Sequence, residues 1–308
     1  ALGGVDVLLL LEQRADEGQA GAEQLGRVHA AVPQRRDPVD QLAGARRLAQ
    51  AVDGAKPVLE LSATGGGHIA LIHDSEHLVI QGLTFSGNAA YADQGYGGIQ
   101  LYTNKNITIR DCEIRQVASS ALYMPYTNTD VLIEHNQIHD TVSGHGIYVG
   151  TWNGSEWATG CNFKNNWIYN INGSGTYGIV IARGSYANSV VDNNIHTVEY
   201  RGIGLAQYTS TDPDPQPNLV ERNAVWSIGN IGIEAHGSSV VRNNLIFNVN
   251  GYGLYSSPAD DDTASELIFA NNTIEGTSSW GVYFRPVSYT HLRAHETKAN
   301  LVCRLLLE

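Results

Sequence analysis

The stretch FKNNWIYNINGSGTYGIVI, residues 163–181, contains two short apolar patterns that recur along most of the chain. The first runs apolar, two residues, asparagine or an equivalent, any residue, apolar, as in FKNNWI at 163–168. The second runs glycine, apolar, any residue, apolar, as in GIVI at 178–181. Eight copies of this ordered pair occur, and their first halves begin 21 to 30 residues apart. A repeat of this kind predicts a stack of similar structural units.

Each copy fits one turn of a coil made from short strands, with apolar side chains inside and polar ones outside. A single turn cannot bury its apolar side chains, whereas turns stacked at a rise of about 4.8 Å form a continuous core. Cys112 takes the asparagine position of its coil, and Cys161 is expected at an inward strand position, so no disulfide is predicted. The asparagines expected to stack at one corner are Asn136, Asn166, Asn193, Asn223, Asn244 and Asn272.

This pattern resembles the right-handed parallel β-helix of the pectate-lyase-like superfamily over about Leu59 to Pro286. The resemblance implies an all-β solenoid of about eight coils, and it specifies the fold rather than a reaction.

The two ends of the chain differ from the repeat region. Residues 1–56 contain no Ser, Thr, Asn, Ile, Phe, Tyr, Trp or Cys, and we interpret them as a separate, non-native or out-of-frame segment. Residues 287–308 resemble translated sequencing-adapter read-through. We therefore expect the β-helix at 57–286, and we expect that further coils followed it in the natural protein.

The net negative charge of the chain restricts which ligands it is expected to bind. The formal net charge is −12, and residues 57–286 account for it with 9 basic and 21 acidic side chains. An acidic solenoid is not expected to bind nucleic acid, and a polyuronate would need local arginines or bound cations. Calcium at Asp260, Asp261 and Asp262 is one source of such cations, although a solvated acidic run is the simpler interpretation. No membrane insertion is expected, and a secreted or cell-surface location is predicted although no signal peptide is visible.

The sequence Gly144-His145-Gly146 resembles the way polygalacturonases present an active-site histidine. Those enzymes pair it with an Asn-Thr-Asp, an Asp-Asp and an Arg-Ile-Lys. Here Asn128-Thr129-Asp130 is present, but the Asp-Asp on a neighbouring coil and the Arg-Ile-Lys are absent, which excludes that chemistry. Gly146 is the glycine of the repeat, so His145 is either a coil-corner residue or a substrate contact.

A groove is expected along the strand that carries the glycine motif. Its outward positions form a tyrosine-rich row that then changes to small residues and one carboxylate; cross-strand aromatic stacking is the alternative interpretation. Long loops on one edge add exposed aromatics. The predicted substrate-binding residues are His145, Tyr148, Trp152, Trp157, Tyr177, Arg183 and Tyr208, and the predicted row is Gln100, Tyr123, Tyr148, Val180, Gly204, Glu234, Tyr255 and Tyr283.

Three ionisable residues are expected to converge in this groove. Glu234 and His236 are two residues apart on one strand, and Arg201 precedes the same strand one coil earlier. Proton abstraction beside a sugar carboxylate needs such a set, with Arg201 binding the anion; an exposed ion pair is the alternative. The sequence thus favours a polysaccharide lyase, epimerase or glycoside hydrolase. The competing function is a non-catalytic solenoid of the adhesin or phage-spike kind.

Overall fold

The computed structural model describes residues 57–60, 67–87, 97–206, 216–256 and 267–284, together with the backbone of the short strand β1 (Arg46–Arg47). Strand β1 pairs in parallel with β4, Arg46 opposite Leu78. The remaining predictions for residues 1–56 and for 287–308 lie outside the described residues.

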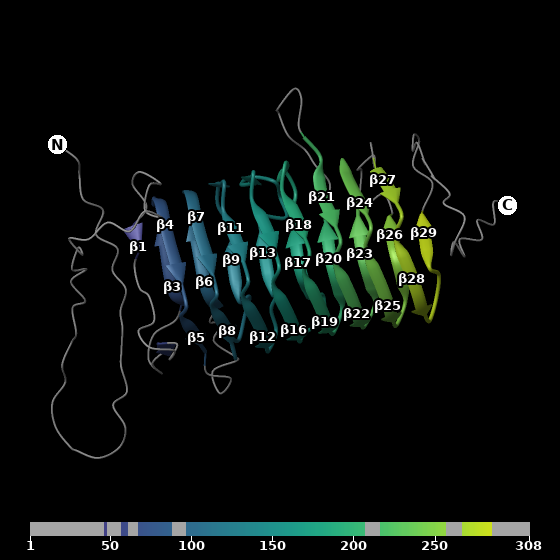
Figure 1. Cartoon of the computed structure of the whole chain (residues 1–308), viewed down its shortest axis with the longest axis horizontal. Coiled ribbons are helices and arrows are strands. Elements are labelled where there is room, and N and C mark those ends of the chain that lie inside the picture. The colour runs from purple at the N-terminus through teal and green to yellow at the C-terminus, as the bar shows by residue number, and fades with distance from the viewer. Residues whose placement is uncertain are drawn as a thin grey trace, which may run out of the picture.

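The described residues form three parallel sheets that run the length of the molecule (Figure 1). Sheet A contains β1, β4 (Glu76–Gln81), β7 (Asn104–Arg110), β10 (Asn128–Thr129), β11 (Leu132–Glu134), β14 (Ala158–Thr159), β15 (Asn162–Lys164), β18 (Ser189–Val191), β21 (Asn218–Glu221), β24 (Ser239–Arg242) and β27 (Leu267–Ala270). Sheet B contains β2 (Val58–Glu60), β5 (Thr84–Ser86), β8 (Glu113–Arg115), β12 (Gln137–Thr141), β16 (Trp167–Ile171), β19 (Asn194–Val198), β22 (Ala224–Ile228), β25 (Leu245–Val249) and β28 (Thr273–Thr277). Sheet C contains β3 (His68–His73), β6 (Gly97–Tyr102), β9 (Leu122–Met124), β13 (Ile147–Val149), β17 (Tyr177–Ile181), β20 (Arg201–Leu205), β23 (Ile231–Ala235), β26 (Tyr252–Ser256) and β29 (Val282–Phe284).

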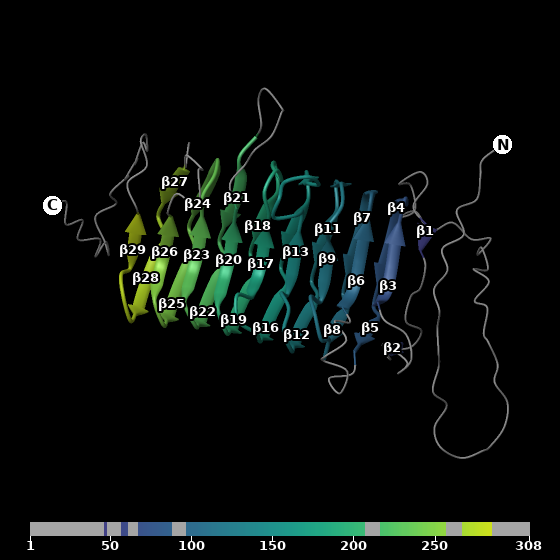
Figure 2. The ribbon, with the colours of Figure 1, turned by 180° about the vertical axis from the view of Figure 1, so that it is seen from behind.

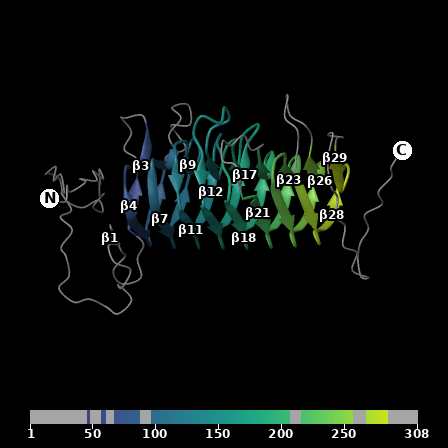
Figure 3. The ribbon, with the colours of Figure 1, turned by 90° about the horizontal axis from the view of Figure 1, so that it is seen from above.

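The chain visits the three sheets in turn, so each strand lies beside the strand one coil earlier and the strand one coil later. Strand β16, for example, pairs with β12 on one side and β19 on the other. The strands cross the long axis of the molecule, and those of sheet B form its lower edge from the front and from behind (Figures 1 and 2). Seen from above, the same order runs from β3 to β29 (Figure 3). The predicted all-β parallel β-helix is confirmed, with one strand, β3, before the first predicted copy in sheet C.

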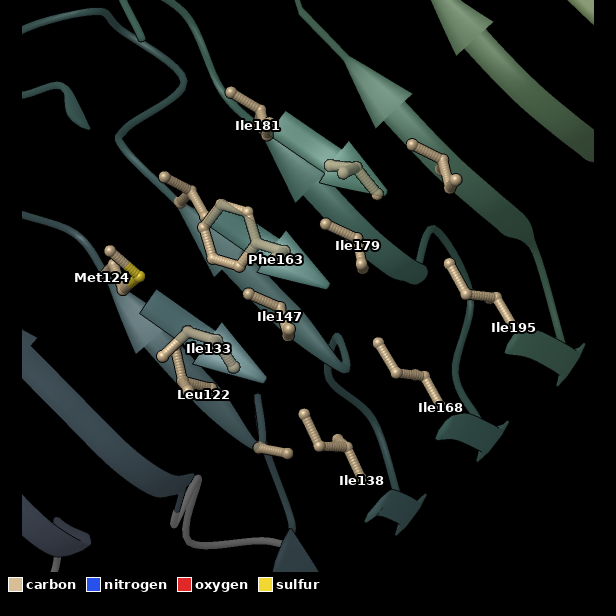
Figure 4. Close-up of a cluster of buried hydrophobic side chains, with 14 of the residues drawn as sticks. Leu122, Met124, Ile133, Ile138, Ile147, Phe163, Ile168, Ile179, Ile181 and Ile195 are labelled. Carbon is tan, nitrogen blue, oxygen red and sulfur yellow. The ribbon is translucent and has the colours of Figure 1, made fainter. Parts of the chain in front are cut away.

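The core consists of columns of buried apolar side chains from all three sheets. Ile138, Ile168 and Ile195 stack from sheet B, and each is fully buried (Figure 4). Ile147 from sheet C and Ile133 from sheet A complete the core layer that contains Ile138. Because burying an isoleucine stabilises the fold by about 1.5–3 kcal/mol, the recurring apolar positions fix the register of every coil.

The repeat glycine is required by close packing. A Cβ at Gly146 would lie 2.7 Å from Cγ2 of Ile168 in sheet B and would also collide with the carbonyl oxygen of Gly178. Gly178 meets Ile195 and the Gly202 carbonyl in the same way. The glycine beside His145 is therefore explained by the fold.

Asparagine side chains form the hydrogen bonds at the corner between sheets A and B. Asn166 donates its backbone N–H and its Nδ2 to Oδ1 of Asn193, at 2.9 and 3.0 Å, and Asn193 repeats both bonds toward Asn223. The residue before each such asparagine has a positive φ, for example 55° at Asn165 and 57° at Asp192. Asn and Asp tolerate that conformation better than most residues, which explains why a polar residue often precedes the repeat asparagine.

A second asparagine column stands at the corner before sheet A, and the repeat did not predict it. Asn104 donates to Oδ1 of Asn128, and Asn188 donates to Oδ1 of Asn218. Cys161 belongs to this column, since its backbone N–H donates to Asn188 and its Sγ contacts the Asn128 carbonyl. Cys161 therefore points into the core as predicted, but it lies at the corner before β15 and not on a strand. Both described cysteines are buried, as predicted.

Candidate active site

The outer face of sheet C carries the predicted row. Each predicted member is the Cα partner of the next, from Gln100 opposite Tyr123 to Tyr255 opposite Tyr283. A second row lies three residues earlier in each coil, where Tyr177, Arg201, Ile231 and Tyr252 are successive partners. Side chains of these two rows form the candidate site.

The three predicted catalytic residues do come together. Oε2 of Glu234 lies 3.0 Å from Nη1 of Arg201, and Oε1 of Glu234 lies 2.9 Å from Nε2 of His236. Glu234 lies on the outer side of sheet C but is only 5% exposed, because neighbouring side chains cover it. The alternative of an exposed ion pair is therefore wrong for Glu234, and the role of the three residues stays a prediction.

Tyr177 completes this group, which we call the Glu234 cluster: Tyr177, Arg201, Glu234 and His236. The Tyr177 hydroxyl donates to Oε2 of Glu234 at 3.0 Å and accepts a hydrogen bond from Nη1 of Arg201. Its ring crosses strand β20 above Gly204, where a Cβ would lie 2.6 Å from Cδ1 and closer still to Cε1. Gly204 is thus needed so that Tyr177 can reach a carboxylate two strands away.

Charge compensation keeps the buried carboxylate ionised. Burial by itself raises the pKa of Glu234, but the His236 hydrogen bond and the Arg201 charge outweigh it, so the pKa lies below its ordinary value. Burial lowers the pKa of Arg201, while the Glu234 charge outweighs that effect and raises it. Burial, and then the neighbouring carboxylate, raise the pKa of Tyr177. Glu234 therefore acts as an acceptor for three donors.

His145 stands one coil before Tyr177 and contacts it directly. Nδ1 of His145 accepts the backbone N–H of Tyr177 at 3.0 Å, which leaves Nε2 as the nitrogen that carries the proton. Burial lowers the pKa of His145 to about 4, so the ring is neutral at pH 7. Ring centroids of Tyr148 and Tyr177 lie 5.0 and 5.6 Å away. His145 is thus a neutral N–H donor among aromatic rings.

The two predicted groups are continuous, although three strand spacings separate β13 from β23. Tyr177 joins them, because its backbone binds His145 and its hydroxyl binds Glu234. The repeat pattern did not indicate that the Tyr177 side chain extends to Glu234. Tyr200 was also missed: its hydroxyl lies 3.4 Å from Nη2 of Arg201, whose guanidinium sits 4.6 Å from the Tyr200 ring centroid.

The loop after β13 brings one further predicted aromatic to this surface. Trp152 is 47% exposed, and its ring centroid lies 6.4 Å from that of Tyr148 and 6.3 Å from that of Tyr177. Trp157 is exposed in the same loop, and Arg183 is half-buried just beyond β17. The remaining predicted residues lie outside the described part of the chain; they are Tyr208 and the acidic run Asp260, Asp261 and Asp262.

Two features of the described residues concern metals and membranes. No group of three or more His, Cys, Asp or Glu side chains there is placed to hold a metal ion. No helix in the same residues has the length and apolarity needed to cross a membrane.

The Asn-Thr-Asp motif has a structural explanation. Its first residue, Asn128, is fully buried in the second asparagine column, where it hydrogen-bonds with Asn104.

Comparison with solved structures finds the same fold in an alginate lyase from Paenibacillus sp. str. FPU-7, with a TM-score of 0.61, 16% identity, and 79% of this chain and 84% of that chain covered. The A-module of a mannuronan C-5 epimerase from Azotobacter vinelandii gives 0.45, 14%, 79% and 78%, and a pectate lyase gives 0.46, 13%, 79% and 69%. A comparison with curated protein sequences finds no match. At these identities the likeness concerns the fold. The family model described as "right handed beta helix region" matches residues 60–214, and the chain belongs to that family.

Proposed function

We propose that this protein is a carbohydrate-active enzyme that binds an extended glycan along the outer face of sheet C and abstracts a proton beside a sugar carboxylate. The convergence of Arg201 and His236 on the buried Glu234 carries this proposal. A buried, ionised carboxylate that holds an imidazole and a guanidinium is an arrangement suited to proton transfer. The proposal implies a secreted or cell-surface protein with a polysaccharide substrate.

Glu234 positions the other groups. Both of its oxygens accept hydrogen bonds, so its lone pairs are used to fix Tyr177, Arg201 and His236. Oε1 of Glu234 holds Nε2 of His236 at 2.9 Å and so fixes the orientation of the imidazole beside Arg201. We therefore assign proton transfer to His236 and orientation to Glu234.

Arg201 supplies the anion contact. Its Nη1 is used by Glu234 and Tyr177, and its partly exposed side chain has further N–H donors for a sugar carboxylate. When His236 removes the proton from the carbon beside that carboxylate, the electron pair delocalises into the carboxylate, where the guanidinium stabilises it. The pair then either forms a carbon–carbon double bond and expels the glycosidic oxygen, which takes up the proton held by His236 or one from water, or it accepts a proton from water on the opposite face of the sugar. The first outcome is a lyase reaction, and the second is epimerisation.

Hydrolysis and a purely structural role fit less well. Glycoside hydrolysis uses two carboxyl groups about 5–9.5 Å apart, whereas Glu234 is the sole carboxylate among the described members of the two rows, and all its oxygens are occupied. A purely structural carboxylate is represented by Glu221 on sheet A, which pairs with two arginines, whereas Glu234 also holds an imidazole, which stability alone does not require.

The full chain should be assayed against sodium alginate, polygalacturonate and a neutral polymer, hydroxyethyl cellulose, by ultraviolet absorbance for unsaturated ends and by NMR for inverted uronates. His236→Ala and Arg201→Ala are expected to lose about 100-fold or more in kcat/KM, and Glu234→Gln a comparable amount. Glu221→Gln is the matched control, since Glu221 is a carboxylate on sheet A that is 9% exposed and pairs with Arg222 and Arg242. Near-wild-type rates in all three variants would refute the assignment.

A further inference from the structure

Three tyrosines lie on the far side of the Glu234 cluster from His145. Tyr252 and Tyr255 come from β26, and Tyr283 comes from β29. The Tyr255 ring centroid is 6.2 Å from that of His236, and the Tyr252 ring lies 5.3 and 5.1 Å from those of Tyr255 and Tyr283. All three are half-buried. They continue the same surface beyond the ionisable cluster.

Their orientation leaves ring surface uncovered. Tyr252 is tilted by 50° and 44° to its two tyrosine neighbours, and Tyr255 meets His236 edge-on at 82°. Tyr255 and Tyr283 stack on each other at 5.5 Å and 10°, so each covers one face of the other. The tilted ring of Tyr252 and the outer faces of the stacked pair are left for the C–H groups of a sugar, and each phenol adds a hydroxyl donor.

The opposite side of the cluster has a corresponding arrangement. There Trp152 is tilted by 63° to Tyr148 and by 48° to Tyr177, beside the neutral His145 donor. The Glu234 cluster therefore lies between two aromatic groups along the axis of the solenoid. A glycan that contacts both groups passes over His236 with sugar units on each side.

We infer that Tyr252, Tyr255 and Tyr283 form a second sugar-binding subsite, and that the enzyme acts on bonds or units inside the glycan chain and not at its ends. This rests on the proposed function for the chemistry, whereas binding of the glycan by the tyrosines can be measured without any reaction. The occupant is an acidic glycan, because this face of sheet C also presents Arg201.

The test uses the full chain, sodium alginate as the probe, and hydroxyethyl cellulose as the neutral comparison. Retardation in gels containing each polymer is measured for wild type, Tyr255→Ala and Tyr283→Ala. Phe247→Ala is the matched control, because Phe247 is a half-buried ring on sheet B that stacks on Trp226 at 3°. Both tyrosine variants are expected to bind alginate several-fold to about tenfold more weakly than wild type, and the control to bind equally. Product sizes are followed by size-exclusion chromatography.

Each outcome separates the two proposals. Early release of mid-length fragments by wild type, with weaker binding by the tyrosine variants, supports the subsite. Unchanged retardation in both tyrosine variants overturns it, whether or not alginate is degraded. Release of only terminal units by wild type overturns action inside the chain. Alginate that is retained through the tyrosines but never modified overturns the proposed function and leaves the subsite standing. A wild-type chain that neither retains nor modifies alginate overturns both.

Discussion

Gly204→Ala is expected to dismantle part of the Glu234 cluster without touching a charged residue. The new Cβ would occupy the space of the Tyr177 ring, 2.6 Å from Cδ1. The ring is the movable partner, because β20 is held between β17 and β23 by backbone hydrogen bonds. Tyr177 must therefore swing away, and its hydroxyl must leave Glu234 and Arg201.

The size of the effect follows from those bonds. Hydrogen bonds to charged groups contribute about 1.5–3 kcal/mol, and Glu234 keeps Arg201 and His236 as partners. We expect a loss of about 2–3 kcal/mol in the free energy of unfolding, with Tyr177→Phe giving a similar loss because it removes only the hydroxyl. In a Tyr177→Ala background, Gly204→Ala should cost no more than about 0.5 kcal/mol, since the ring is absent.

Two measurements test this prediction. Urea unfolding gives the free energies, and ultraviolet titration counts phenolates. Burial holds the pKa of Tyr177 above its ordinary value, so the displaced ring of Gly204→Ala should ionise nearer pH 10 and add one phenolate there. Gly281→Ala is the control, because a Cβ at Gly281 meets nothing closer than 3.9 Å. Wild-type stability and an unchanged titration in Gly204→Ala would refute the placement of Tyr177.

Two further predictions concern stability. Unfolded His145 takes up a proton below pH 6.5 but folded His145 only near pH 4, so wild-type stability should fall by about 3 kcal/mol across that window as pH drops. His145→Asn, which keeps an acceptor for the Tyr177 N–H, should remove that component from urea-unfolding curves; identical pH slopes would contradict it. Asn193→Ala leaves the two Asn166 donors and the Phe163 carbonyl without a hydrogen-bond partner. It should lower the free energy of unfolding by roughly 3–5 kcal/mol. The exposed neighbour Asn194→Ala should cost under about 0.5 kcal/mol, and equal losses would exclude a special role for the column.

The convergence of Arg201, Glu234 and His236 was predictable because the coils stack in register. In a parallel stack, aligned motif positions become Cα partners, so an alignment of repeats is also a map of neighbours. Gly204 opposite Glu234, and Arg201 opposite Ile231, follow from the glycine motif alone. The repeat alignment therefore places residues that are 30 apart in sequence on neighbouring strands.

Features that depend on side-chain reach or on variable spacing were not predictable in this way. The path of Tyr177 over Gly204 depends on a ring conformation and a missing Cβ, neither of which a repeat alignment encodes. In the second asparagine column, Asn104 precedes the inward residue Ile109 by five positions, whereas Asn188 precedes Val190 by two. The column therefore has no constant offset in the sequence, and Cys161 was misplaced for the same reason.

Aromatic content alone does not distinguish the candidate site, because sheet B also carries a column of rings: His139, Tyr169, His196, Trp226 and Phe247 are successive Cα partners. Successive rings there stack 4.4–5.5 Å apart with interplanar angles of 3–19°. One ring per coil at the strand spacing leads to face-to-face stacking, so the faces are covered by neighbours and only edges meet solvent.

Sheet C breaks that regularity at Val180, Gly204 and Glu234, where the row has no ring. The gap leaves room for the Tyr177 ring from the second row. On the His145 side of the gap the rings of Tyr148, Tyr177 and Trp152 tilt instead of stacking, whereas Tyr255 and Tyr283 beyond it stack at 10°. A regular aromatic column stabilises a solenoid, whereas an interrupted one leaves ring faces uncovered beside ionisable groups. The interruption, more than the number of tyrosines, is therefore the feature that favours this face for the proposed glycan site.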